Sequence, residues 1–167
     1  MSMSVIGLMY ETVEHVTIFI ARDRMTWNLF IDDERNPEDV TWAPWHIREK
    51  CRNEPWVVCR NYTDAIAEVL NRGFPSFISF DHDLGDNTKT GHDIAKTLVE
   101  ADIQSGENPN RSGYKFADNF DFYVHSKNPV GKANIEGLLN SYLKHKNSLL
   151  LYLQNLKKYL FLYLVSF

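Results

Sequence analysis

A cluster of ionisable side chains follows a short apolar run in the middle of the chain. The run at 77–80 is directly followed by Asp81, His82 and Asp83. Carboxylates and imidazoles packed this closely repel or desolvate one another unless a cation, a shared proton or an anionic ligand compensates them, and active sites use such arrangements. We therefore interpret the segment 79–86 as a candidate site.

Two more polar clusters follow apolar runs in the same way. Asp32 and Asp33 come directly after one run, and His125 and Ser126 come directly after another. In open parallel sheets, ligands bind beyond the carboxyl ends of the strands. If the three runs are strands of one such sheet, the three clusters should converge at one rim.

The carboxylates of these clusters form a set that suits a hard cation. Neighbouring strands lie about 4.8 Å apart, so side chains at strand ends of equal height can share one ion. We predict that Asp32, Asp33, Asp81 and Asp83 hold a divalent metal, with Mg²⁺ or Mn²⁺ as the favoured cofactor. A histidine ligand from the same clusters would shift the preference toward Mn²⁺, Fe²⁺ or Zn²⁺.

Strand-like and helix-like segments alternate along the chain. Apolar runs rich in β-formers predict strands at 29–31, 56–59, 77–80 and 120–124, and apolar residues at helical spacing predict helices from Ala65, from His92 and after Pro129. Strands joined by helices of this size cannot pair as hairpins, so the sheet should be largely parallel with helices on its faces. The sequence predicts a doubly wound α/β domain.

Two stretches between these elements are predicted to be loops. The fifteen residues after Pro37 contain a second proline and two tryptophans, Trp42 and Trp45, which either pack over the strand ends or line a pocket. Packing is the favoured interpretation. The segment 104–119 is long and polar, and it is predicted to be a lid or disordered.

Composition limits the class of protein. A chain of 167 residues with 44% apolar residues is sized for one domain with its own core. Its net charge of −4 lacks the basic footprint of nucleic-acid binders, which favours a small-molecule partner over long nucleic acid. Cys51 and Cys59 lack zinc or redox spacing, and no signal-peptide pattern is found, so the cytoplasm is the expected location.

The two ends lie outside the α/β pattern. Residues 1–24 are predicted to be an N-terminal extension to a domain at 25–146, and within them 13–20 half-alternate like an edge strand. In 147–167, apolar residues at spacings of four and three predict an amphipathic helix. This helix could dock on the sheet, pair with a second copy in a homodimer or lie on a membrane surface. Lys157 and Lys158 argue against a membrane span.

The motifs resemble those of the cyclic-phosphate processing receiver-like family, which occurs in bacteria and their phages. The resemblance covers about residues 28–143, and its four motifs stand in the family's order. They are Phe30-Ile31-Asp32-Asp33-Glu34-Arg35-Asn36-Pro37, Phe80-Asp81-His82-Asp83-Leu84-Gly85, Thr90-Gly91-His92-Asp93-Ile94-Ala95 and Val124-His125-Ser126-Lys127-Asn128-Pro129. An ordinary receiver domain carries a lysine after a fifth strand; no clear fifth strand with such a lysine is found, which disfavours phosphorelay.

The resemblance implies a receiver-like (flavodoxin-like) fold and the processing of cyclic phosphates, either cyclic nucleotides or 2′,3′-cyclic phosphate ends. We expect a metal-dependent phosphoesterase in which a metal-bound water or Asp81 attacks phosphorus and His82 or His125 protonates the leaving group. Ser126, Lys127 and Asn128 are expected to bind the phosphate. The alternative is an inactive module that binds a nucleotide or a partner protein, and a conventional phosphoacceptor ranks last.

Each motif also has a structural interpretation. Acids before a proline-rich loop, such as Asp32 and Asp33, are common in solvated turns. His82 could be a packing histidine, and Asn128 before a proline is most simply a turn and helix start. The presence of Asp81 favours function for Asp32 and Asp33 over a turn, and function is the favoured interpretation of His125.

Overall fold

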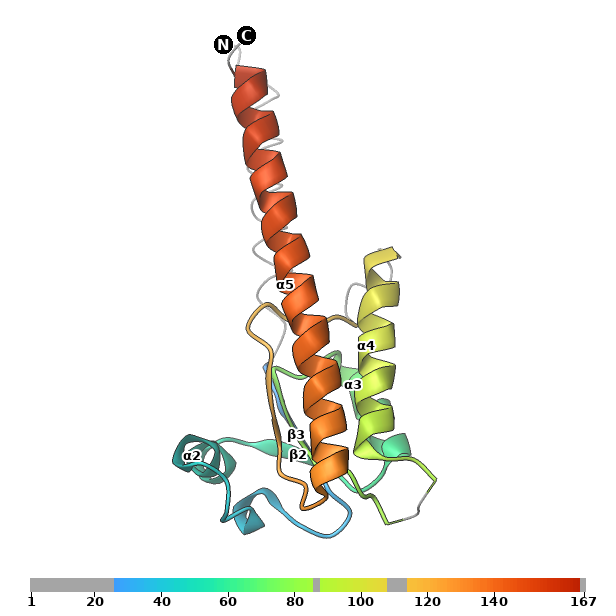
Figure 1. Ribbon diagram of the computed structural model, residues 1–167. Helices are drawn as coiled ribbons and strands as arrows, with labels where there is room; N and C mark the ends of the chain where they lie inside the picture. The colour runs from blue at the N-terminus through green and yellow to red at the C-terminus, as the bar shows by residue number, and fades with distance from the viewer. Residues whose placement is uncertain (1–25, 86–87, 108–113, 166–167) are drawn as a thin grey trace, which may run out of the picture.

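Four parallel strands form the centre of the protein. The computed structural model describes residues 26–85, 88–107 and 114–165 (Figure 1). The sheet order is β2-β1-β3-β4, with every neighbouring pair parallel. The strands are β1 (Asn28–Ile31), β2 (Trp56–Cys59), β3 (Phe77–Phe80) and β4 (Asp121–Val124). The predicted strands and their parallel arrangement are confirmed, whereas the extension predicted at 1–24 lies outside the described residues.

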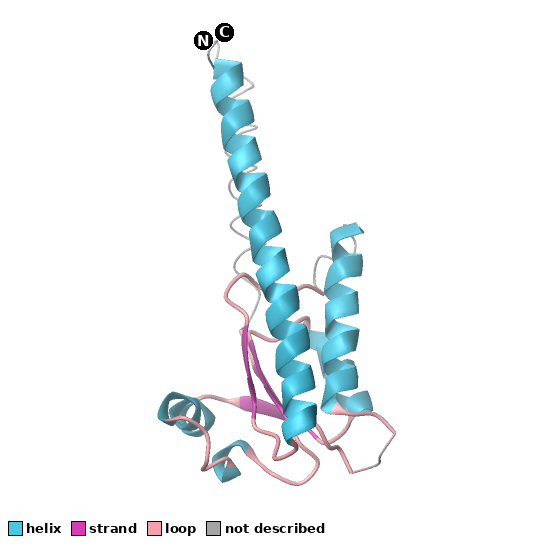
Figure 2. Ribbon diagram, viewed as in Figure 1, coloured by secondary structure: helices cyan, strands magenta, loops and turns pink. Residues whose placement is uncertain are grey.

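Helices cover both faces of the sheet (Figure 2). On one face, Leu29 and Ile31 pack with residues of α3 (Tyr62–Arg72), α4 (Gly91–Glu107) and α5 (Pro129–Val165). On the other face, Phe30 packs with Val40 and Ala43, which follow the short 3-10 helix η1 (Pro37–Asp39), and with α2 (Trp45–Asn53). From β1 to β2 the chain moves toward one edge of the sheet, and in the two later crossovers it moves toward the other edge. Because the crossovers have the same hand, α2 lies on the opposite face of the sheet from α3 and α4. The doubly wound α/β prediction is confirmed.

Helix α2 shows that the loop prediction after Pro37 was wrong. Pro44 precedes the first helical residue, where its missing N–H and fixed φ do no harm. Ile47 and Cys51, four residues apart, are both buried against the sheet. The prolines therefore mark the start of a short helix rather than a continuous loop.

Helix α4 is longer than predicted, and part of the segment 104–119 is helical. Its polar residue Asp102 is buried and accepts hydrogen bonds from Tyr142 Oη at 2.9 Å and Lys146 Nζ at 2.7 Å. Lys146 also donates to the carbonyl of Phe116 at 2.9 Å. Asp102, just before the predicted segment, thus forms an ion pair that joins α4 to α5.

Helix α5 runs without a break through the boundary predicted at residue 146. Ile135 and Leu139 in its first half are fully buried in the core. Past Lys146 the helix projects beyond the sheet (Figure 1), and Leu149, Leu153 and Leu156 are exposed. The homodimer and the membrane-surface contact of this segment stay predictions. None of the described helices has the length and apolarity that crossing a membrane requires.

Candidate active site

Three strand ends bring the polar clusters to one rim of the sheet. In the register of the sheet, Ile31 lies opposite Phe80, and Phe80 lies opposite Val124. The next residues along the chain, Asp32, Asp81 and His125, therefore stand at the same height on adjacent strands. The order of the sheet reverses between β1 and β3, which is where doubly wound folds bind ligands.

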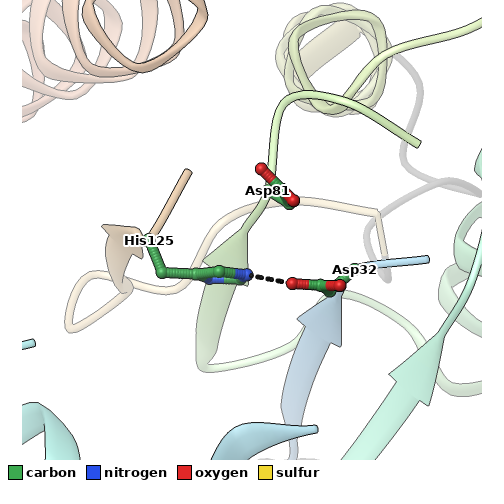
Figure 3. A group of neighbouring side chains, drawn as sticks. All are labelled: Asp32, Asp81 and His125. Atoms are coloured by element: carbon green, nitrogen blue, oxygen red, sulfur yellow. Dashed lines mark hydrogen bonds and ion pairs between the residues drawn. The ribbon is translucent and has the colours of Figure 1, made fainter. Parts of the chain in front are cut away.

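These three side chains form a compact buried group (Figure 3). Asp32, Asp81 and His125 each offer one ligand-type atom, and these atoms lie within 4.8 Å of one another. The exposed fractions are 0%, 3% and 0% respectively. Burial of two carboxylates and an imidazole at one point is costly unless each is paired, so the partners of each group decide what the site can do.

His125 is held by hydrogen bonds on both ring nitrogens. Its Nε2 lies 3.0 Å from Asp32 Oδ2, and its Nδ1 lies 2.8 Å from Ser79 Oγ. The ring also stacks on Phe30, with centroids 4.6 Å apart and planes 9° from parallel. A carboxylate only accepts, so Nε2 donates to Asp32. In this position the ring orients Asp32 and has no free nitrogen for a ligand.

Asp32 is the most strongly stabilised carboxylate of the group. Its Oδ1 accepts the backbone amides of Glu34 at 2.9 Å and Arg35 at 2.6 Å. Burial by itself would raise the pKa of Asp32, but the hydrogen bond with His125, the two amides and the charge of Arg35 together lower it to about 2. Asp32 is therefore ionised at neutral pH.

Arg35 lies between the two carboxylates, a role that the sequence pattern did not predict. Its Nε is 2.7 Å from Asp32 Oδ2, and its Nη2 donates to Asp81 Oδ2. Asp81 Oδ1 accepts the amide of His82 at 2.7 Å. The only signal in the sequence was a cation three residues after Asp32, where a turn can direct it back to the strand end.

Arg60 fixes the turn that carries Arg35. Its guanidinium donates to the carbonyls of Asp32 at 3.1 Å and Arg35 at 2.6 Å, and to Asn36 Oδ1 at 2.6 Å. These carbonyls would otherwise need other partners at the end of β1. Arg60 thereby keeps the backbone of the turn in the shape that directs Arg35 toward Asp81.

The donor set suits a divalent cation in composition. Two carboxylates and one imidazole within 4.8 Å match the preferences of Mn²⁺, Fe²⁺ or Zn²⁺. The facing oxygens of Asp32 and Asp81 are, however, already paired with Arg35. A cation bound by all three side chains would therefore require the guanidinium to move and His125 Nε2 to give up its proton and its bond with Asp32.

The family comparison agrees with this geometry. The sequence model described as the cyclic-phosphate processing receiver domain matches residues 27–141. The chain belongs to this family. No curated protein and no solved structure matches the chain. The matched range of this receiver domain contains all three strand ends and stops inside α5, before its exposed leucines.

The other two predicted metal ligands lie at the edge of the receiver domain's site. Asp33 is partly exposed, and its Oδ2 lies so close to Gly85 that a Cβ there would be 2.6 Å away. Asp83 is exposed and accepts from Asn128 Nδ2 at 3.3 and 3.4 Å. Among the described residues, the compact ligand group contains neither of them, and their role as ligands stays a prediction.

Two of the three predicted phosphate-binding residues shape the start of α5. Ser126 Oγ accepts the amide of Asn128 at 3.1 Å, and Asn128 Oδ1 accepts the amide of Gly131 at 2.9 Å. These bonds cap the helix. Lys127 is exposed at the rim and is the member of the three whose charge is free to meet an anion.

His82 packs between the starts of two helices. A Cβ on Gly131 would lie 2.1 Å from His82 Cγ, so the ring is in direct contact with the first turn of α5. On the other side, His92 in the first turn of α4 is close enough to interact electrostatically with His82. The Nδ1 of His82 is buried without a hydrogen-bond partner among the described residues.

Proposed function

We propose that this receiver domain binds a cyclic phosphodiester at the rim formed by Asp32, Asp81 and Arg35 and hydrolyses it to a linear phosphomonoester. Membership of the family suggests an involvement with cyclic phosphates. The observation that carries the proposal is at Arg35: its Nη1 is buried and has no hydrogen-bond partner among the described residues. A buried donor without an acceptor is costly, and a phosphate oxygen would satisfy it.

In the proposed reaction, a water molecule or Asp81 attacks phosphorus, and the ring P–O bond breaks. Attack by water forms the monoester in one step, whereas attack by Asp81 forms an aspartyl phosphate that water then cleaves. Arg35 neutralises the charge that builds on the phosphoryl oxygens. His82 gives a proton to the leaving alkoxide, because both nitrogens of His125 are already bonded.

We propose a divalent cation, Mg²⁺ or Mn²⁺, as cofactor. Asp32 and Asp81 would hold it after displacement of Arg35, with Asp33 and Asp83 as additional carboxylates at the edge. When bound, such an ion supplies Lewis-acid stabilisation of phosphoryl oxygens and a more acidic water.

The alternative is a receiver domain that binds a nucleotide or a partner protein without turnover. One observation favours it: His125 and both carboxylates are already paired within the protein, so none of the three is a free base. The two functions differ in the fate of the ligand, which enzymes convert and binding modules release intact.

Incubation with 2′,3′-cyclic and 3′,5′-cyclic nucleotides tests the proposal. The purified protein should yield linear monophosphates, identified after denaturation, in Mg²⁺ or Mn²⁺, and EDTA should lower the rate if the proposed cation takes part. Recovery of tightly bound but intact cyclic nucleotide would establish the binding module instead. If the protein neither binds nor turns over mononucleotides or RNA with 2′,3′-cyclic ends, both the hydrolase and the nucleotide-binding module are contradicted.

Substitution of Gly131 by alanine tests the role of His82. The new Cβ would lie 2.1 Å from His82 Cγ, so the ring must move, and turnover should fall by roughly tenfold to a hundredfold. Gly137→Ala in the same helix is the matched control, since a Cβ there meets nothing within 4 Å. That control should keep full turnover and gain about 0.5–1 kcal/mol in unfolding free energy. Equal turnover in both variants would rule out His82 as the proton donor.

A further inference from the structure

An exposed tryptophan lies directly beside the rim. Trp42 precedes α2 in the chain, and its Nε1 donates to the backbone carbonyl of His125 at 3.3 Å. Although this bond holds the ring at the end of β4, 44% of the residue is exposed. The sequence favoured packing for Trp42, but a side chain that only packs would be expected to bury more of its apolar surface.

Two cations lie near the ring of Trp42. Arg35 Cζ is 5.4 Å and Lys127 Nζ is 5.0 Å from the ring centroid. Arg35 is fixed there, because Asp32 and Asp81 hold its guanidinium. Lys127 is exposed and takes part in none of the ion pairs of the described residues. A ligand could displace Lys127 from the ring at the small cost of an exposed cation–π contact, and the ammonium group would remain near the ligand.

We propose that Trp42 is a stacking platform for the base of a nucleotide whose cyclic phosphate lies at Arg35. This inference rests on the proposed function and narrows its substrate class to cyclic nucleotides, as opposed to cyclic phosphates without a base. One guanidinium separates the ring from Asp81, so a single small ligand can contact the aromatic face and the phosphate rim together. Aromatic rings bind bases with little sequence preference, because every base has a π-face.

Trp45 provides an internal comparison. It is also near the start of α2 and is 70% exposed. Its one ring contact within the described chain is with His46, at 6.1 Å between centroids. Because Trp45 has no described contact with Arg35, Lys127 or His125, exposure of a tryptophan by itself does not mark the site. What marks the site is the position of Trp42 beside Arg35 and Lys127, the groups proposed to meet the phosphate.

The test compares two ligands that differ only in the base. Binding of 2′,3′-cyclic AMP and of methyl riboside 2,3-cyclic phosphate is measured by calorimetry, together with turnover of each. Wild-type protein should bind the nucleotide about tenfold or more tightly than the base-free ligand. Trp42→Ala should abolish that preference with little change in affinity for the base-free ligand. Trp42→Phe, which can stack but cannot donate to His125, should retain most of the preference for the nucleotide. Trp45→Ala should retain all of that preference.

Several outcomes would overturn the platform. Equal affinity of the wild-type protein for the two ligands would refute the stacking platform and leave the proposed function intact. The same holds if Trp42→Ala lowers the affinity for both ligands by the same factor. The second result would show that Trp42 only positions Arg35 or His125. If neither ligand binds to the wild-type protein or is turned over by it, the platform and the proposed function are refuted together.

Discussion

Replacing Asp81 by asparagine is expected to lower the turnover of 2′,3′-cyclic AMP by about a hundredfold or more. An asparagine amide can neither take a proton from water nor attack phosphorus, whichever of the two roles the carboxylate has. Arg35 and the amide of His82 donate to different oxygens of Asp81, so the single side-chain oxygen of asparagine can keep one of these two bonds while the size of the side chain stays the same. Single-turnover kinetics measure the loss, and a thermal melt shows whether the variant remains folded.

Asp83→Asn is the matched control in the same loop. Asp83 is exposed and its described partner is Asn128, so this variant should retain turnover within about threefold of wild type if Asp83 is only peripheral. Acid quench followed by borohydride reduction would convert an aspartyl phosphate at residue 81 to homoserine, which separates the two routes of attack. Full activity of Asp81→Asn would exclude Asp81 as base and as nucleophile. Equal losses of turnover in the two variants would mean that Asp83 shares the role of Asp81.

The convergence of the site could be predicted because it follows from topology. Polar residues after three parallel strands must meet at one rim once the strands are adjacent and in register. The alternation of side chains decides which member of each polar pair faces the site. Asp32, Asp81 and His125 have the same parity in the register and face one another, whereas Asp33 lies against Gly85 and Ser126 is bonded to the start of α5. Without the register, Asp32 and Asp33 could not be told apart.

The partners of the site groups could not be predicted in the same way. Arg35 meets Asp81 at a separation of 46 residues, and no local pattern encodes such a pair. The pair of Asp102 and Lys146, 44 residues apart, could not be predicted for the same reason. Helix α2 was missed because proline was taken as a breaker, although proline is compatible with the first turn of a helix.

Arg35→Gln is expected to reduce the free energy of unfolding by about 3 kcal/mol. Arg35 is the cation that pairs with both Asp32 and Asp81, whose side chains are 0% and 5% exposed. Its removal leaves two buried carboxylates facing each other, with His125 and two backbone amides as the described partners of Asp32. Urea denaturation at neutral pH measures the loss. Arg52→Gln is the control: its ion pair with Glu49 is exposed, so the change should stay below about 0.5 kcal/mol.

The same variant also tests whether Arg35 occupies the place of a metal ion. If the guanidinium neutralises the carboxylates that would otherwise hold a cation, Mn²⁺ should raise the melting temperature of Arg35→Gln clearly and that of wild type little, because a ligand stabilises only the state that binds it. Equal stabilisation of both proteins would show that the ion binds beside Arg35, through Asp33 and Asp83 at the edge of the rim. No stabilisation of either would argue against a metal at these carboxylates, leaving Arg35 as the charge that the phosphate meets.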